Sequence, residues 1–454
     1  MRESLLQYNK FSAYGSPLGR NNNFAEAELL ALKDAYSMLP GGALGGNALS
    51  DDCRFVFDRG DGAYFWDLSN NIYIDYCLGS GPLVLGHAHH SVTSAVKEQA
   101  EKGLHFFAYL NKNAVQLARL VLEMVPCAER IRFTNSGSEA TFHAIRLARA
   151  ATKREKILKF EGAYHGHHDY AQISTTPQKD EIYLHGEPDS AGIPEVVQKL
   201  MLVAPYNNLE ITRSLVEKHA KDIAAIIVEP IQRIISPVPG FLEGLREIAD
   251  ENDIVLIFDE VVTGFRFGAG GAQEYFKIRP DLCTLGKIIG GGSPLGAVAG
   301  RADVMDLCDP RHKGEQDYVY QNGTLQGNPL STAIALSTIN ELRKPGFYQK
   351  LFERGEAIRD LVTAVLKRHN LPAICFGEGP MWHILFASKV PKNHRDVMAA
   401  DKKALMHFDS EMIRKGLFVL PGNRRFISIC HNDDVINKTA SAMDEVCRSV
   451  KYPF

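Results

Sequence analysis

The chain has 454 residues, of which 45% are apolar and 23% charged, and its net charge is −3. This composition is typical of a soluble globular protein, and the charge argues against nucleic acid or an anionic membrane as a partner. No apolar run reaches the roughly 18–20 residues that a membrane helix needs. The eight cysteines are scattered without a CxxC pair, so neither a zinc site nor a disulfide framework is indicated. With an N-terminus that has no signal-peptide or transit-peptide character, the sequence predicts a reduced, cytoplasmic protein.

Residues 1–74 combine a helical pattern with strand-like runs. An amphipathic stretch covers Phe24 to Met38, and the strand-like runs that follow are "RFVFDRG", "AYFWDL" and "IYIDYCLG". We expect this N-terminal segment to pack with a smaller domain formed by the C-terminal part of the chain.

From about Ala114 onward, helical patterns alternate with short apolar runs. The runs include "RIRFTNSG", "KILKFEGAY", "IAAIIVEP" and "IVLIFDEV". Continuous Val/Ile/Leu runs joined by helices predict strands of a parallel sheet that is buried on both faces. Residues 75–330 are therefore predicted to form a large doubly wound α/β domain with a mostly parallel central sheet. Residues 331–454 are predicted to form the smaller α+β domain.

Polar residues follow several of these strands at their carboxyl ends. They occur in "FTNSGSEA" at 133–140, "FEGAYHGHHD" at 160–169 and "IFDEV" at 257–261, and Lys287 follows a fourth apolar run. Ligands of open α/β sheets bind beyond the carboxyl ends of the strands. These side chains are expected to surround one crevice.

The turn "NSGSEA" is a candidate phosphate site. Backbone amides at Gly137 and Ser138, the Ser138 hydroxyl and the helix N-terminus could together bind a phosphate. The same letters also suit a helix N-cap without a ligand. No Walker loop occurs in the chain.

Three further residues could contact a planar, cationic ligand. Asp259 ends a buried strand, where a carboxylate needs a cationic partner such as a protonated ring nitrogen, although a local donor would also satisfy it. Tyr164 and His165 lie just past another strand, where an aromatic ring can form one wall of a cofactor site. The histidines of "HGHHD" lack the i, i+4 spacing of a helical zinc pair, so no metal is predicted.

Lys287 is the only charge between Asp281 and Arg301. Apolar surroundings lower the pKa of a lysine and make its amine nucleophilic. A phosphate cup, a buried carboxylate and an aromatic wall beside such an amine fit a pyridoxal 5′-phosphate (PLP) site. Lys287 would hold the aldehyde as a Schiff base, and Asp259 would keep the ring nitrogen protonated.

The motifs "NSGSEA", "YHGHHD", "VEPI", "FDEVVTGFR", "LGKIIGGG" and "NGTLQGNPL", in this order, resemble those of the class III (fold type I) PLP-dependent aminotransferases. Within this family the chain looks most similar to glutamate-1-semialdehyde aminomutases and to β-amino acid and phenylglycine aminotransferases. The resemblance implies a cofactor site made of Lys287, Asp259, Gly137, Ser138, Tyr164 with the adjacent His165, Glu229 near the 3-hydroxyl side, and Thr324. Because Thr324 would reach the phosphate of a neighbouring subunit, the resemblance also implies a homodimer with shared active sites.

Three departures from the mutase pattern favour intermolecular amino transfer. Ser80 stands where the mutases carry a tryptophan, the stretch "STTPQKDEIYLHGEPDSAGIP" replaces their gating loop, and "GGALGGNALSDD" lacks an expected arginine. We therefore expect a ping-pong aminotransferase acting on an α- or β-amino acid, aromatic ones included, and a keto acid. The alternative is an intramolecular aminomutase of the glutamate-1-semialdehyde type. Decarboxylation, epimerisation and a cofactor-free scaffold are further alternatives.

The substrate carboxylate needs a separate partner. Arg424 and Arg425 in "LPGNRRFISICHNDD" are candidates, because the planar fork of arginine suits bidentate carboxylate binding. Of the two, Arg425 is the preferred choice, with a solvated surface turn as the alternative for both. Arg266 is expected to be structural. Phe106, Phe107 and Tyr109 line either the substrate side or a helix core.

Overall fold

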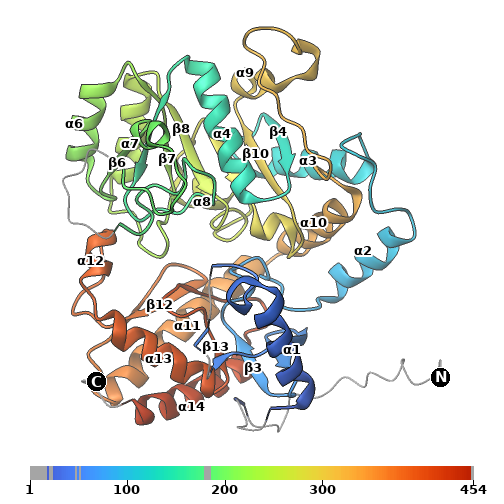
Figure 1. Cartoon of the computed structure of the whole chain (residues 1–454), viewed down its shortest axis with the longest axis vertical. Helices are drawn as coiled ribbons and strands as arrows, with labels where there is room; N and C mark the ends of the chain where they lie inside the picture. The colour runs from blue at the N-terminus through green and yellow to red at the C-terminus, as the bar shows by residue number, and fades with distance from the viewer. Residues whose placement is uncertain (1–17, 20–23, 47–48, 51–52, 178–185, 451–454) are drawn as a thin grey trace.

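The computed structural model describes residues 18–19, 24–46, 49–50, 53–177 and 186–450. Figure 1 shows a sheet flanked by helices in the upper half of the view, and a group of helices with smaller sheets below it. Within the described ranges, no helix has the length and apolar character that crossing a bilayer requires.

The upper half is built on a seven-stranded sheet with the order β4–β10–β9–β8–β7–β5–β6. The strands from β9 to β6 are parallel, whereas β10 runs antiparallel to both of its neighbours. The bounds are β4 Arg130–Thr134, β5 Lys156–Phe160, β6 Met201–Ala204, β7 Ile223–Val228, β8 Val255–Glu260, β9 Leu282–Leu285 and β10 Gly296–Gly300. The predicted α/β fold with a mostly parallel central sheet is thus confirmed.

Both faces of this sheet are buried, as the apolar runs predicted. Along β7, Ala225 and Ile227 belong to an apolar cluster that includes α4, whereas Ile226 and Val228 belong to another that includes α7. The helices of this part of the chain are α2 His90–Ala100, α3 Lys112–Met124, α4 Gly137–Thr152, α5 Glu195–Lys199, α6 Leu209–His219, α7 Phe241–Glu251, α8 Gly271–Phe276, α9 Ala302–Met305 and α10 Pro329–Leu342. Short 3₁₀ turns occur at Lys287–Gly290, Asp306–Cys308 and Pro310–His312.

The lower half contains two small sheets. One has the order β1–β2–β3–β13 and the other β11–β12–β14. The bounds are β1 Phe57–Asp61, β2 Tyr64–Asp67, β3 Ile72–Asp75, β11 Ile374–Phe376, β12 Met381–Leu385, β13 Leu417–Phe418 and β14 Arg425–Phe426. The helices are α1 Glu26–Met38, α11 Phe347–Arg368, α12 His394–Met398, α13 Lys402–Arg414 and α14 Asp433–Ser449, and a 3₁₀ turn covers Pro40–Gly42.

One strand pair joins distant parts of the chain. β13 lies parallel to β3, with Ile74 N donating to Gly416 O at 2.8 Å and Tyr76 N donating to Phe418 O at 2.9 Å. The N-terminal sheet therefore includes a strand from the C-terminal part of the sequence. The domain limits at 74/75 and 330/331 remain a prediction.

Candidate active site

Lys287 lies directly beyond the carboxyl end of β9, at the start of a 3₁₀ turn. Its φ of 49° is unusual for a residue with a side chain, and such strained backbone is often found at functional sites. Burial, and then the charge of Arg424, lower the pKa of Lys287 to about 8, while Asp259 and Glu229 act in the opposite direction. Among the described residues its amine has no hydrogen-bond partner. Lys287 is therefore a largely buried, unengaged amine.

Asp259 is near the carboxyl end of β8 and is 4% exposed. Its Oδ2 lies 2.7 Å from Nδ1 of His165, and its Oδ1 accepts from Thr284 Oγ1 at 3.0 Å and Val261 N at 3.1 Å. These three donors fill three of the roughly four lone-pair directions of a carboxylate. Asp259 is held in place and can still accept one more hydrogen bond.

Glu229, the residue after β7, connects two candidate residues. Its Oε2 accepts from Tyr164 N at 3.0 Å, and its Oε1 lies 3.5 Å from Nη1 of Arg424. The Tyr164 side chain keeps 39% of its surface exposed, and the guanidinium of Arg233 lies 5.2 Å from its ring centroid. Glu229 thus links the loop after β5 to the C-terminal part of the chain.

The N-terminus of α4 adjoins these groups. Ser136 caps the helix by accepting from Glu139 N at 3.1 Å, so the predicted N-cap is present. The amides of Gly137 and Ser138 have no acceptor among the described residues, and Ser138 Oγ accepts from His167 N at 2.9 Å. A Cβ atom on Gly286 would lie 3.4 Å from Gly137 Cα. Gly286, the residue before Lys287, therefore lies close to the first residue of α4.

These residues fit PLP by the chemistry of their groups. The site offers an unengaged amine for an aldehyde, a buried carboxylate for a ring nitrogen, and two free amides at a helix N-terminus for a phosphate. His165 Nε2 is buried without a partner among the described residues. The same ranges contain no cluster of His, Cys, Asp or Glu that could hold a metal ion.

Ser80 is exposed in a turn whose backbone has positive φ at Leu78, Gly79, Ser80 and Gly81. Arg266 supports this turn: it is fully buried, donates to Gly81 O and Val262 O, and lies 4.6 Å from the Phe426 ring centroid. Its charge also contributes to the lowered pKa of Lys287. The turn that carries Ser80 is thus connected to the crevice through Arg266.

The two adjacent arginines point in opposite directions. Arg424 Nη1 donates to Arg233 O at 2.5 Å and approaches Glu229, whereas Arg425 is fully buried and pairs with Asp409 and with His383 Nδ1 at 2.6 Å. Neighbouring side chains of an extended segment alternate between its faces. Arg424 therefore lies on the side of Glu229, whereas Arg425 lies on the side of Asp409, and which of the two binds a substrate carboxylate stays a prediction.

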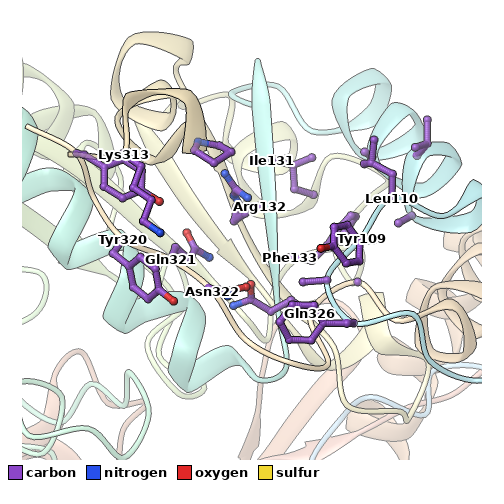
Figure 2. A pocket seen from close by; sticks show the side chains of 18 residues that line it. Tyr109, Leu110, Ile131, Arg132, Phe133, Lys313, Tyr320, Gln321, Asn322 and Gln326 are labelled. Carbon is purple, nitrogen blue, oxygen red and sulfur yellow. The ribbon is translucent and has the colours of Figure 1, made fainter. Parts of the chain in front are cut away.

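Thr324 and the aromatic residues lie elsewhere on the chain. Thr324 is exposed in the turn before α10, and no contact within the described residues joins it to Lys287. Phe106, Phe107 and Tyr109 are 50%, 47% and 75% exposed, so they do not pack in a helix core. A cavity of about 570 Å³ lies here, and Figure 2 shows Tyr109 and Phe133 on one side of it and Tyr320 and Gln321 on the other.

Two residues at the site were missed by the sequence analysis. Thr284 donates to Asp259, and Arg233 lies beside Tyr164. Thr284 on β9 lies directly opposite Asp259 on β8, and the sequence alone does not reveal this strand register. Arg233 is the second residue after the "VEPI" motif, and no sequence pattern marks it as part of a site.

Comparisons with known proteins agree with this chemistry. Residues 47–431 match the family model described as Aminotransferase class-III. The chain is 42% identical over 397 residues to a glutamate-1-semialdehyde 2,1-aminomutase of Methanocaldococcus jannaschii, covering 86% of this chain and 91% of the relative. An ω-transaminase from Sphaerobacter thermophilus has a similar structure, with a TM-score of 0.87, 32% identity, and coverage of 93% and 97%. A transaminase solved with PLP bound gives a TM-score of 0.85 at 26% identity, with coverage of 94% and 98%.

Proposed function

We propose, because this chain belongs to the class-III aminotransferase family of PLP-dependent enzymes, that it moves an amino group between carbons of one small substrate. This is the reaction type named for the glutamate-1-semialdehyde aminomutase that is 42% identical over 86% of the chain. That identity is the observation that carries the proposal. The identity favours an intramolecular aminomutase, which the sequence analysis gave as the alternative, over an intermolecular aminotransferase.

The residues of the site have separable tasks in this reaction. Bound PLP would supply an aldehyde and an electron-withdrawing ring. Lys287 would hold that aldehyde, and its free amine would move a proton at the substrate carbon that carries the amino group. Asp259, oriented by Thr284 and His165, holds the proton at the ring nitrogen. The amides of Gly137 and Ser138 bind the phosphate.

Arg424 is the proposed partner of the substrate carboxylate. It is largely buried, its charge influences Lys287, and its contact with the Glu229 carboxylate is long at 3.5 Å. A substrate carboxylate could form a shorter, bidentate contact with the same guanidinium. Glu229 would keep the arginine placed when no substrate is bound.

Intermolecular amino transfer is the second candidate, because a specific observation favours it. Ser80 is exposed and small at the position where the resembling mutases carry a tryptophan. A mutase must retain its intermediate, and a small residue at the mouth favours release and exchange. The replaced gating loop also supported transfer, but residues 178–185 of that stretch lie outside the described residues, as do residues 47–48 and 51–52 of the segment lacking the arginine.

A two-arm assay separates the candidates. Purified enzyme is given glutamate-1-semialdehyde without an amino acceptor and, separately, α- and β-amino acids with pyruvate or 2-oxoglutarate. Formation of the isomer without acceptor supports the mutase, and Lys287→Ala serves as the inactive control. Stoichiometric keto acid with no isomerisation would overturn the proposal in favour of the transferase.

A homodimer is proposed as the working form. Thr324 lies in sequence between Asn322 and Gln326, which line the cavity of Figure 2 together with the exposed apolar side chains Phe107, Tyr109, Leu110 and Tyr320. The Gln321 side chain beside them is 6% exposed and has no hydrogen-bond partner among the described residues. A second copy would cover this region and bring Thr324 to its partner's phosphate site. Sedimentation of Tyr109→Glu, compared with wild type, tests this, and an unchanged mass near 50 kDa for both would contradict it.

A further inference from the structure

The segment 161–175, which follows β5, contacts three residues of the proposed cofactor site, Glu229, Asp259 and Ser138. Tyr164 N donates to Glu229, His165 Nδ1 pairs with Asp259, and His167 N donates to Ser138 Oγ. The backbone oxygen of His165 also accepts from Thr141 on α4. The position of this segment therefore determines where the ring wall and the partner of Asp259 lie.

Lys159 on β5 lies beneath this segment and is fully buried. Its Nζ donates to Ile173 O at 2.5 Å, to Ala171 O at 2.9 Å and to Ala163 O at 3.3 Å. Thr175 Oγ1 lies further away at 3.5 Å. Three carbonyl acceptors match the three N–H groups of an ammonium, and they come from both ends of the segment.

The cation has no carboxylate in direct contact among the described residues. Its charge is costly in such a place: burial lowers the pKa of Lys159 to about 7, with Asp189 and Glu229 opposing this change. Its strand neighbours Leu158 and Phe160 are also fully buried, so an aliphatic side chain would suit the strand without that cost. What lysine adds is the three bonds to the segment.

We propose that Lys159 is a positioning residue that joins the two ends of segment 161–175 and so places Tyr164 and His165 for the cofactor. The inference rests on the proposed PLP site, but its structural part concerns this chain alone. Lys159 touches neither substrate nor cofactor and acts through the backbone of the segment.

The test compares Lys159→Met with Lys156→Met. Methionine has similar length but no donor, and Lys156 lies on the same strand with a partly exposed amine that bonds Asp222 at 2.9 Å. The readouts are hydrogen exchange of peptides spanning 161–175 in cofactor-free and PLP-loaded enzyme, the PLP dissociation constant, and kcat and KM separately.

We expect Lys159→Met to speed exchange within 161–175 by about tenfold or more, with β8 peptides unchanged. The PLP dissociation constant should rise about tenfold, and kcat should fall more than KM changes. Lys156→Met should match wild type in all three. Wild-type exchange and PLP affinity in Lys159→Met would overturn the proposal.

A second variant keeps the test decisive. If Lys159→Met does not fold, Lys159→Gln, which retains two N–H donors, is measured in the same way and should give smaller changes in the same direction. Loss of the fold in both would overturn the proposal, because Lys159 would then serve the whole fold rather than this segment. Failure of wild type to isomerise glutamate-1-semialdehyde would remove the proposed activity but leave the exchange result valid.

Discussion

The lowered pKa of Lys287 has a measurable kinetic consequence. Only a neutral amine attacks an aldehyde, and the pKa of Lys287 is about 8 against 10.5 for a free lysine. That difference leaves about 9% of the amine neutral at pH 7 instead of about 0.03%, an increase of about 300-fold. Cofactor-free enzyme should therefore react with PLP far faster at pH 7 than a free lysine does, apart from any contribution of binding.

The assay is stopped-flow mixing of cofactor-free enzyme with PLP between pH 6 and pH 10, followed by visible absorbance. Nα-acetyllysine measured in parallel corrects for the ionisations of PLP itself. The rate should rise with pH, because the neutral amine is the reactive form, and should level off above pH 8. Arg424→Met removes a cation that lowers the pKa of Lys287, so its midpoint should move to higher pH, whereas Arg279→Met should not move it, since Arg279 is exposed and pairs with Glu129.

A wild-type midpoint near that of Nα-acetyllysine would refute this reasoning, because the buried position would then have no effect on the amine. An unchanged midpoint in Arg424→Met would refute the contribution of its charge and, with it, the placement of Arg424 beside Lys287.

Four other outcomes are expected. Asp259→Asn should reduce turnover by about 100-fold or more, because an amide cannot keep the ring nitrogen protonated; a near wild-type rate in the steady state would contradict its role. Arg424→Gln should raise KM for carboxylate-bearing substrates about tenfold or more, with little change in KM for simple amines. Arg425→Met should instead lower the unfolding free energy measured with urea by about 3–5 kcal/mol, because Asp409 stays buried without its partner. Burial lowers the pKa of His431 to about 4: below pH 6.5 the unfolded chain takes up a proton that the folded one does not, so stability should fall by up to about 3 kcal/mol between pH 6.5 and 4. A urea midpoint with the same pH dependence in wild type and His431→Gln would contradict this last expectation.

Much of the central sheet could be predicted because its strands are continuous apolar runs followed by polar residues. The reversed direction of β10 could not, since "GAVAG" is apolar and small and carries no signal of orientation. Likewise, Lys159 in "KILKF" looks like an ordinary charged position on a strand. The role proposed for Lys159 depends on the folded segment 161–175, which brings three backbone carbonyls to the Lys159 amine.

The candidate positions could be proposed where a residue ends or follows a buried strand: Asp259 is near the carboxyl end of β8, and Glu229 and Lys287 come after β7 and β9. The choice between Arg424 and Arg425 could not be made in this way, because β14 has only two residues and offers no periodicity to assign their faces. Asp409, which binds Arg425, is sixteen positions earlier on another element, and such a pairing depends on tertiary packing. Local pattern alone therefore does not tell which member of the pair faces Glu229.

The pairing of β3 with β13 also affects how the protein folds while it is being synthesised. β3 leaves the ribosome about 340 residues before β13, which at ordinary translation speeds is a delay of roughly 20–70 s. Throughout that interval the edge of β3 that later pairs with β13 is covered only by the bridge between Gly19 and Ile72 and can pair with other nascent chains. Cells that make this protein must shield that edge until the last tenth of the polypeptide arrives, and a truncated messenger would release a chain that can never close it.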